Sequence, residues 1–200
     1  AQEIRYPTII RTTADHTGQN MIRLSGPADM DELERLPFDG RDYYSIAFVD
    51  YRNADGHYGK LRLVKVGGKI LPRHMILGED WKVHSGQRAE GINASDTAIA
   101  RERAYLEDPE GFLGQRLYSQ LGTALERTGL DYVGVDFGLL DDGRAVLFEC
   151  NACTNAATRT RHARTAPARA AAVERIKAAF YDCVHEAAVA CSTGTEEQES

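Results

Sequence analysis

Two carboxylates stand on a pair of predicted strands where they could hold a divalent cation. Residues 134–153 read GVDFGLLDDGRAVLFECNAC, which is two apolar runs on either side of Asp142-Gly143. That dipeptide favours the conformations of a two-residue type I′ turn, so the segment predicts a β-hairpin. With this turn, strand pairing places Asp136 directly across from Glu149.

Opposed strand residues have Cβ atoms about 4.5 to 5.5 Å apart, and two carboxylates at that distance repel by roughly 1 kcal/mol in water. A divalent cation between them removes the repulsion, and an asparagine carbonyl is a suitable further oxygen ligand. Because strand side chains alternate between faces, Asn151 shares a face with Glu149 and pairs with Gly134. We therefore predict that Asp136, Glu149 and Asn151 bind a metal ion. The alternatives are one protonated carboxyl group or a solvated acidic face.

A second predicted hairpin brings two cations together. The run GKLRLVKVGGKILPRHMIL turns at Gly67-Gly68, and counting outward from the turn places Arg62 across from Arg73. Two opposed guanidinium groups repel as the carboxylates do. This pair therefore predicts that an anion binds there, with solvated surface charge as the alternative.

The bulk composition describes an ordinary globular chain. Its 200 residues are 42% apolar and 27% charged, with a net charge of −6 and a pI near 5.5. The negative charge argues against a general binder of nucleic acid or anionic membranes, and no apolar stretch is long enough to span a membrane. We expect a cytoplasmic protein without nucleic-acid or membrane partners.

The four cysteines are too few and too clustered for a disulfide framework. Cys150 and Cys153 have C-x-x-C spacing, so zinc bound with His162, or thiol chemistry, remains an alternative. No second C-x-x-C follows, and Cys150 falls on the strand face opposite the predicted metal ligands.

The order of predicted elements indicates an α+β fold with antiparallel sheets. Strands are expected at 8–12, 20–24 and 43–52, then the two hairpins, with helices from Asp29 to about residue 36, at 96–106, 109–128 and 166–190. The long helix should direct Val173, Ile176, Phe180 and Val184 inward. We expect a small lobe at 1–49, a larger lobe at 50–191, a disordered acidic tail at 192–200 and a nucleotide in the crevice between the lobes.

The two hairpins resemble the second half of an ATP-grasp domain of the glutathione synthetase type, over about residues 6–155. GVDFGLLDDGRAVLFECNAC is similar to the hairpin of that family that holds magnesium, which implies Mg²⁺ or Mn²⁺ on Asp136, Glu149 and Asn151. KLRLVKVGGKILPRH resembles its basic hairpin, which implies that Arg62 and Arg73 face the transferring phosphate, with Lys60 at a place that is often acidic.

The resemblance also implies nucleotide contacts. YPTIIRT is similar to the strand whose last basic residue, here Arg11, lies on the phosphates, where lysine is usual. Gly18 would belong to the glycine loop over the phosphates, and His84 to a loop that contacts substrate or phosphate. The resemblance further implies backbone contacts of Phe48 and Val49 with adenine and of Asp50 with ribose, with Ala47 in place of the usual glutamate.

The implied function is a Mg-ATP-binding domain of a carboxylate-amine ligase that acts through an acyl phosphate. Its substrates would be a carboxylate and an amine. The family carries a further domain ahead of the YPTIIRT strand, so the resemblance implies a missing N-terminal domain of a longer parent chain. A nucleotide-binding regulatory module without catalysis is the alternative.

Overall fold

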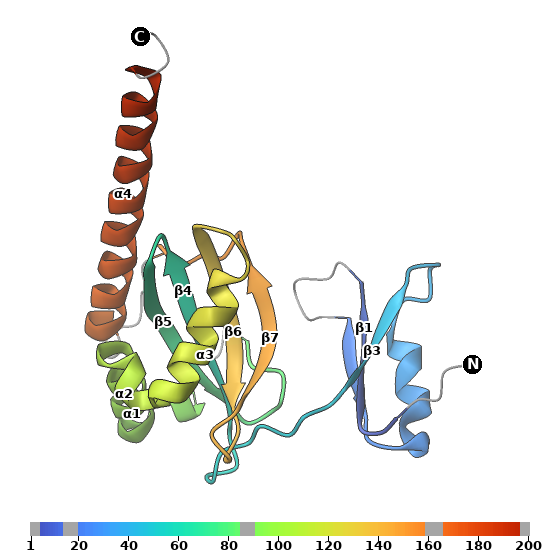
Figure 1. Cartoon of the computed structure of the whole chain (residues 1–200). Coiled ribbons are helices and arrows are strands. Elements are labelled where there is room, and N and C mark those ends of the chain that lie inside the picture. The colour runs from blue at the N-terminus through green and yellow to red at the C-terminus, as the bar shows by residue number, and fades with distance from the viewer. Residues whose placement is uncertain (1–4, 14–19, 85–90, 159–165, 197–200) are drawn as a thin grey trace. The chain divides into compact units, whose positions relative to one another are not determined.

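The computed structural model describes residues 5–13, 20–84, 91–158 and 166–196, and it divides the chain into two compact units. Unit 1 comprises Ala1–Asp50 and unit 2 comprises Tyr51–Ser200. Strands and helices occur in both units, and the strands pair antiparallel, so the predicted α+β class is confirmed (Figure 1).

In the residues that the structure describes, unit 1 is a three-stranded sheet with one short helix. The sheet has the order β2-β1-β3, built from β1 (Thr8–Thr12), β2 (Met21–Leu24) and β3 (Tyr43–Ala47). Its small core contains Ile10, Leu24 and Leu36. The helix η1 (Pro27–Arg35) is a 3-10 helix that begins two residues earlier than predicted, and the Asp29 carboxylate inside it accepts a hydrogen bond from the Ser25 amide at 2.6 Å.

Unit 2 is built on a four-stranded sheet of order β5-β4-β6-β7. The strands are β4 (Tyr58–Val66), β5 (Lys69–Gly78), β6 (Tyr132–Leu139) and β7 (Ala145–Asn151). The helical segments are η3 (Gly91–Ala94), α1 (Asp96–Glu107), α2 (Pro109–Leu113), α3 (Gln115–Glu126) and α4 (Ala166–Glu196). Among the helices of the described residues, none is long and apolar enough to cross a membrane.

Side-chain alternation gives this sheet two different faces. One face packs Leu61, Leu63 and Phe137 against α1 and α3 in the main core. The other face packs Val64 and Val66 against Ile176, Ala179 and Ala156. Arg62, an even-numbered residue of β4 like Val64, belongs to this second face, which also carries the candidate site.

Two helix predictions require correction. The predicted helix at 109–128 is broken at Gly114, whose φ of 78° ends α2 before α3 begins. Phe180 and Val184 are 47% and 52% exposed rather than buried, because the later part of α4 extends beyond the sheet (Figure 1). Val173 and Ile176 are buried as predicted. The helix itself continues to Glu196, into the segment for which an acidic tail is predicted.

Candidate metal and nucleotide site

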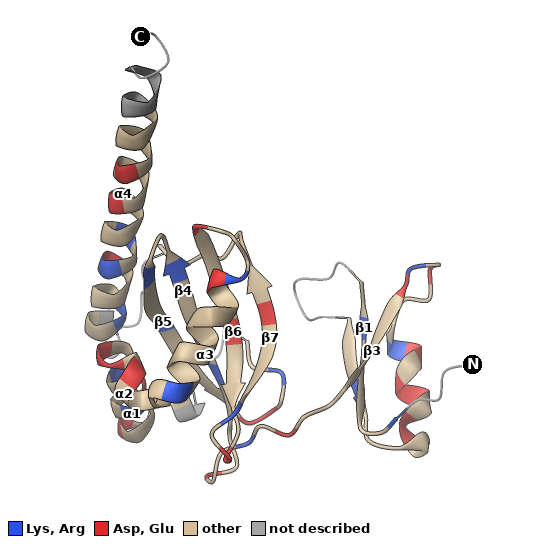
Figure 2. Cartoon of the chain, viewed as in Figure 1, with Lys and Arg blue, Asp and Glu red and all other residues tan. Residues whose placement is uncertain are grey.

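The hairpin of β6 and β7 pairs the residues that the sequence predicts, Asp136 with Glu149 and Gly134 with Asn151. Figure 2 shows the acidic residues on these two neighbouring strands. The turn that joins the two strands differs from the prediction, which assumed a two-residue turn.

The turn contains one more residue than predicted. The Leu140 amide donates to the Arg144 carbonyl at 2.9 Å, and Gly143, with φ 79°, donates to the Leu140 carbonyl at 3.0 Å. This three-residue loop shifts the pairing by one residue, so that Phe137 lies opposite Leu147. A bulge on β7 between that pair and the next restores the register, and therefore the two carboxylates still face each other.

Two cations of β4 neutralise these carboxylates. Asp136, only 3% exposed, accepts a bidentate pair of hydrogen bonds from Arg62: Nε to Oδ1, and Nη2 to Oδ2 at 2.8 Å. Lys60 Nζ lies 3.3 Å from Asp136 Oδ2, and Arg62 Nη2 lies 3.8 Å from Oε1 of the half-exposed Glu149. The carboxylate repulsion expected from the sequence is thus relieved by charges of the chain itself.

The Arg62 guanidinium is held in its charged form. Burial acts to lower its pKa, but the hydrogen bond and the charge of Asp136 outweigh burial, so the pKa of Arg62 is raised. Sequence reasoning noted Lys60 only as a departure from the family motif. Its position two residues before Arg62 on one strand was the available signal, because such residues share a face.

Asn151 presents the third candidate oxygen. Its Oδ1 accepts a hydrogen bond from the Cys153 amide at 2.7 Å, which fixes the direction of the carbonyl group. Asp136, Glu149 and Asn151 together offer hard oxygen atoms on one face of the hairpin, the donor type that Mg²⁺ and Mn²⁺ prefer. These residues fit such an ion, provided that Arg62 gives up part of its contact with Asp136.

The predicted pairing of Arg62 with Arg73 is wrong. Leu63 pairs with Pro72 but Arg62 pairs with His74, so that Arg73 is an extra residue in β5. Proline lacks a donor for the ladder and is found on edge strands and at bulges, and β5 is an edge strand. The bulge at Pro72 therefore explains the shift.

Arg73 is 2% exposed and contacts backbone rather than a carboxylate. Its Nε donates to the Ala156 carbonyl and its Nη2 to the Thr158 carbonyl, each at 2.7 Å. Burial lowers the pKa of Arg73, and the nearby charges of Arg62 and Arg169 lower it further. Its role toward a phosphate stays a prediction.

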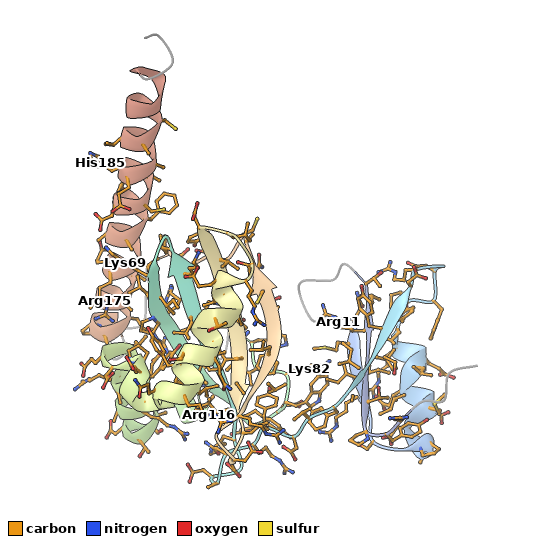
Figure 3. All side chains as sticks on the ribbon, in the orientation of Figure 1. Arg11, Lys69, Lys82, Arg116, Arg175 and His185 are labelled. Atoms are coloured by element: carbon orange, nitrogen blue, oxygen red, sulfur yellow. The ribbon has the colours of Figure 1, made fainter. Side chains whose placement is uncertain are left out.

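The nucleotide residues predicted in unit 1 lie around β1 and after β3. Arg11 is half-buried on β1, between Met21 of β2 and Tyr44 of β3 (labelled in Figure 3). The Phe48 amide donates to the Pro7 carbonyl at 3.0 Å, so this amide is already committed within the unit.

Beyond β3, the Arg23 guanidinium lies 4.7 Å from the centroid of the Phe48 ring, a contact that sequence reasoning did not foresee. Val49 is 42% exposed, and Asp50 is also exposed. Gly18 lies outside the described residues, and His84 is an exposed residue at the end of a described range.

The cysteine alternative gains little support. Cys150 and Cys153 are free and exposed, and His162 lies outside the described residues. Burial, and then the charge of Glu149, raise the pKa of the Cys150 thiol, which disfavours the thiolate that binds zinc or attacks disulfides. Across ranges 5–13, 20–84, 91–158 and 166–196, no three His, Cys, Asp or Glu residues form a metal-binding group.

Sequence comparison finds distant relatives. No protein-family model matches the chain. N-acetylaspartylglutamate synthase A of Homo sapiens is 22% identical over 152 residues, which cover 76% of this chain and 34% of that protein. The enzyme of Mus musculus is also 22% identical over 152 residues, 76% of this chain and 35% of that protein. The chain therefore spans about a third of the length of the curated relatives it matches.

Solved structures similar to the chain include a synthase and a ligase. One is carboxyaminoimidazole ribonucleotide synthase from Aspergillus clavatus, complexed with ATP, with a TM-score of 0.44, 18% identity and coverage of 85% of this chain and 41% of that one. Another is D-alanine-D-alanine ligase from Helicobacter pylori, with a TM-score of 0.46, 9% identity and coverage of 86% and 49%. With TM-scores below 0.5, these likenesses establish no family for this chain.

Proposed function

We propose that this chain is a Mg-ATP-binding domain of the ATP-grasp type, from a ligase that joins a carboxylate to an amine. One observation carries the proposal: Asp136 and Glu149 face each other across β6 and β7, with Asn151 on the same face and Arg62 beside them. This face of the neighbouring strands β4, β6 and β7 offers oxygen ligands for a metal ion and a guanidinium group for a phosphate.

The roles of the side chains follow from their contacts. Mg²⁺ or Mn²⁺ on Asp136, Glu149 and Asn151 would neutralise charge on the phosphate oxygens. The guanidinium of Arg62 donates from Nε and Nη2 to the two carboxylate oxygens of Asp136. A phosphate group could accept the same pair of hydrogen bonds. Arg62 would therefore move from Asp136 to the phosphate as the metal-nucleotide complex binds, while Lys60 supplies a second positive charge.

The proposed reaction needs no nucleophilic side chain. An oxygen of the carboxylate substrate attacks the γ-phosphorus of ATP, ADP leaves, and an acyl phosphate forms. The amine nitrogen then attacks the acyl carbon, inorganic phosphate leaves, and the nitrogen loses a proton to phosphate or water, which gives an amide. The residues of the chain contribute position and electrostatic stabilisation. Arg11 and Arg73 on the phosphates, Gly18 and His84 in the adjoining loops, and Phe48, Val49 and Asp50 at the nucleoside complete the proposed site.

The whole ligase reaction is proposed for the parent protein, because the chain spans only about a third of its relatives. The substrates are a carboxylate and an amine.

A second candidate is a nucleotide-binding module without catalysis. The engagement of both Asp136 oxygens by Arg62 favours this candidate, since it leaves the metal ligand neutralised inside the chain.

Calorimetric titration with ATP tests the binding proposal. We expect ATP to bind in Mg²⁺ and binding to be lost in EDTA. Glu149→Gln should weaken Mg-ATP binding by about tenfold or more, because it removes a charged metal ligand. Glu186→Gln, a matched change at an exposed position of α4, should leave binding unchanged.

Equal affinity in Mg²⁺ and EDTA would refute the metal role. Catalysis is judged separately, by phosphate release across a panel of carboxylates and amines with the same chain. Binding without any carboxylate-dependent release of phosphate would favour the non-catalytic module.

A further inference from the structure

The structure leaves one costly feature unexplained, the buried cation of Arg73. Among the residues that the structure describes, no carboxylate forms an ion pair with Arg73, although its side chain is 2% exposed. A buried charge without a direct ion pair is expensive, and the charge of Glu102, which acts to raise the pKa of Arg73, does not outweigh burial. Two hydrogen bonds to backbone carbonyls partly compensate.

Those carbonyls belong to the segment that directly follows the third proposed metal ligand. After Asn151 ends β7, residues 152–158 have neither helical nor strand structure. Backbone groups in such a segment need partners from elsewhere. Arg73 donates two hydrogen bonds to this segment, one to the Ala156 carbonyl and one to the Thr158 carbonyl. The positive charge of the guanidinium strengthens both hydrogen bonds.

Strand β6 holds the same segment at a point nearer to Asn151. The Tyr132 hydroxyl donates to the Thr154 carbonyl at 2.7 Å. Thr154 lies so close to β6 that a Cβ placed on Gly134 would be 2.6 Å from its Cγ2. Since Gly134 is the strand partner of Asn151, Thr154 packs directly beside that ligand.

The contact that aims Asn151 comes from this segment. The Cys153 amide donates to Asn151 Oδ1 at 2.7 Å, so the direction of the ligand carbonyl depends on where residue 153 lies. Residue 153 in turn depends on the attachments at Thr154, Ala156 and Thr158. Residues that orient a ligand in this way typically change metal affinity by about 10- to 100-fold when they are removed.

We propose that Arg73 is a positioning residue: it holds residues 152–158 against the sheet and thereby directs the Asn151 carbonyl toward the metal-nucleotide complex. The inference rests on the proposed function. It assigns to Arg73 an action through Asn151, in addition to the predicted phosphate role.

Lys65 offers a matched control for a purely structural role. It is also a buried cation, 5% exposed, that donates to a loop carbonyl, Leu130, at 2.8 Å. It lies on the opposite face of β4 and approaches Glu126 of α3 at 3.3 Å. Arg73→Gln and Lys65→Gln therefore remove comparable charges, and only the first touches the segment after Asn151.

The test combines deuterium exchange of the full chain with binding of Mn²⁺ and ATP followed by Mn²⁺ electron paramagnetic resonance. We expect Arg73→Gln to raise deuterium uptake in peptides that cover 152–158 and to weaken Mn·ATP binding by about tenfold or more. Arg73→Lys should recover part of both effects. Tyr132→Phe keeps the ring and removes the hydrogen bond to the Thr154 carbonyl, so it should raise deuterium uptake and weaken Mn·ATP binding to a smaller extent. This variant replaces Arg73→Gln in the test if Arg73→Gln does not fold.

Lys65→Gln should lower stability without weakening Mn·ATP binding by the folded protein. Equal effects of Arg73→Gln and Lys65→Gln on binding would overturn the inference, as would unchanged uptake at 152–158 in Arg73→Gln. Failure of the unsubstituted chain to bind Mn·ATP would overturn the proposed function instead. In that case the exchange measurement alone decides whether Arg73 holds the segment.

Discussion

At the scale of single residues, Arg62 is the group on which the state of the candidate site depends. Its two hydrogen bonds to Asp136 stabilise a buried carboxylate. The same hydrogen bonds occupy the oxygen atoms that are proposed to bind the metal ion. A free metal ion must therefore compete with a guanidinium, whereas a metal-nucleotide complex brings a phosphate that Arg62 can bind instead.

We expect Arg62→Gln to strengthen Mn²⁺ binding without nucleotide by on the order of tenfold, equivalent to about 1.4 kcal/mol. In EDTA the same variant should lose about 3 kcal/mol of unfolding free energy, because Asp136 stays buried without its main partner. Electron paramagnetic resonance and urea unfolding measure the two effects. Arg116→Gln, at an exposed position of α3 (Figure 3), is the control. Unchanged or weaker Mn²⁺ binding would show that Arg62 does not compete for the site.

At the scale of elements, a buried ion pair joins α1 to α4. Arg169 Nη2 lies 2.6 Å from Glu102 Oε2, and the two side chains are 1% and 6% exposed. Glu102 Oε1 also accepts the Met75 amide of β5 at 3.1 Å, so one carboxylate links two helices and a strand. Farther along α4, Asp182 forms an exposed salt bridge with Lys69 of β5 at 2.7 Å (Lys69 is labelled in Figure 3). An exposed salt bridge of this kind contributes little to the free energy of unfolding.

Arg169→Met should lower the unfolding free energy of unit 2 by about 3 kcal/mol or more, because it leaves the Glu102 carboxylate buried and unpaired. The double variant Glu102→Gln, Arg169→Met should lose less than Arg169→Met alone. Urea unfolding followed by the fluorescence of Trp81, the one tryptophan of the chain, measures these changes. Lys177→Met, which breaks an exposed pair with Glu174 on the same helix, should cost less than about 1 kcal/mol. A double variant at least as unstable as Arg169→Met would contradict this account.

At the scale of the whole molecule, the chain consists of two units with separate cores. The proposed metal ligands belong to unit 2, and Arg11 belongs to unit 1. Unit 1 contains about fifty residues and a small core, and domains of that size are marginal in stability.

Leu24→Ala should therefore destabilise unit 1 by about 3 kcal/mol while leaving unit 2 folded. Leu24 is fully buried in the core of unit 1. Deuterium exchange should show lost protection in β1, β2 and β3 and unchanged protection in β4 to β7. The reciprocal variant, Leu63→Ala, should lower protection in unit 2 only. Loss of protection in both units from Leu24→Ala would mean that they unfold as one.

Much of the candidate site follows from local patterns in the sequence. Alternation of side chains along a strand places Glu149 and Asn151 on one face, and a turn between two apolar runs makes the strands pair antiparallel. These preferences act over a few residues, so they can be read without knowing the rest of the fold. The pairing of Asp136 with Glu149 is correct even though the turn has three residues, because a bulge offsets the turn.

Tertiary structure alone decides what faces that pair. Arg62 meets Asp136 because β4 and β6, 74 residues apart at this contact, are neighbours in the sheet. No local preference specifies which strands become neighbours, since that depends on the summed packing of both sheet faces. The bulge beside Pro72 likewise leaves Arg73 without a direct strand pairing to Arg62, and Arg73 instead donates to the segment after Asn151. The sequence by itself thus determined which charged residues gather on the strands, and the long-range pairing of β4 with β6 determined which of them neutralise one another.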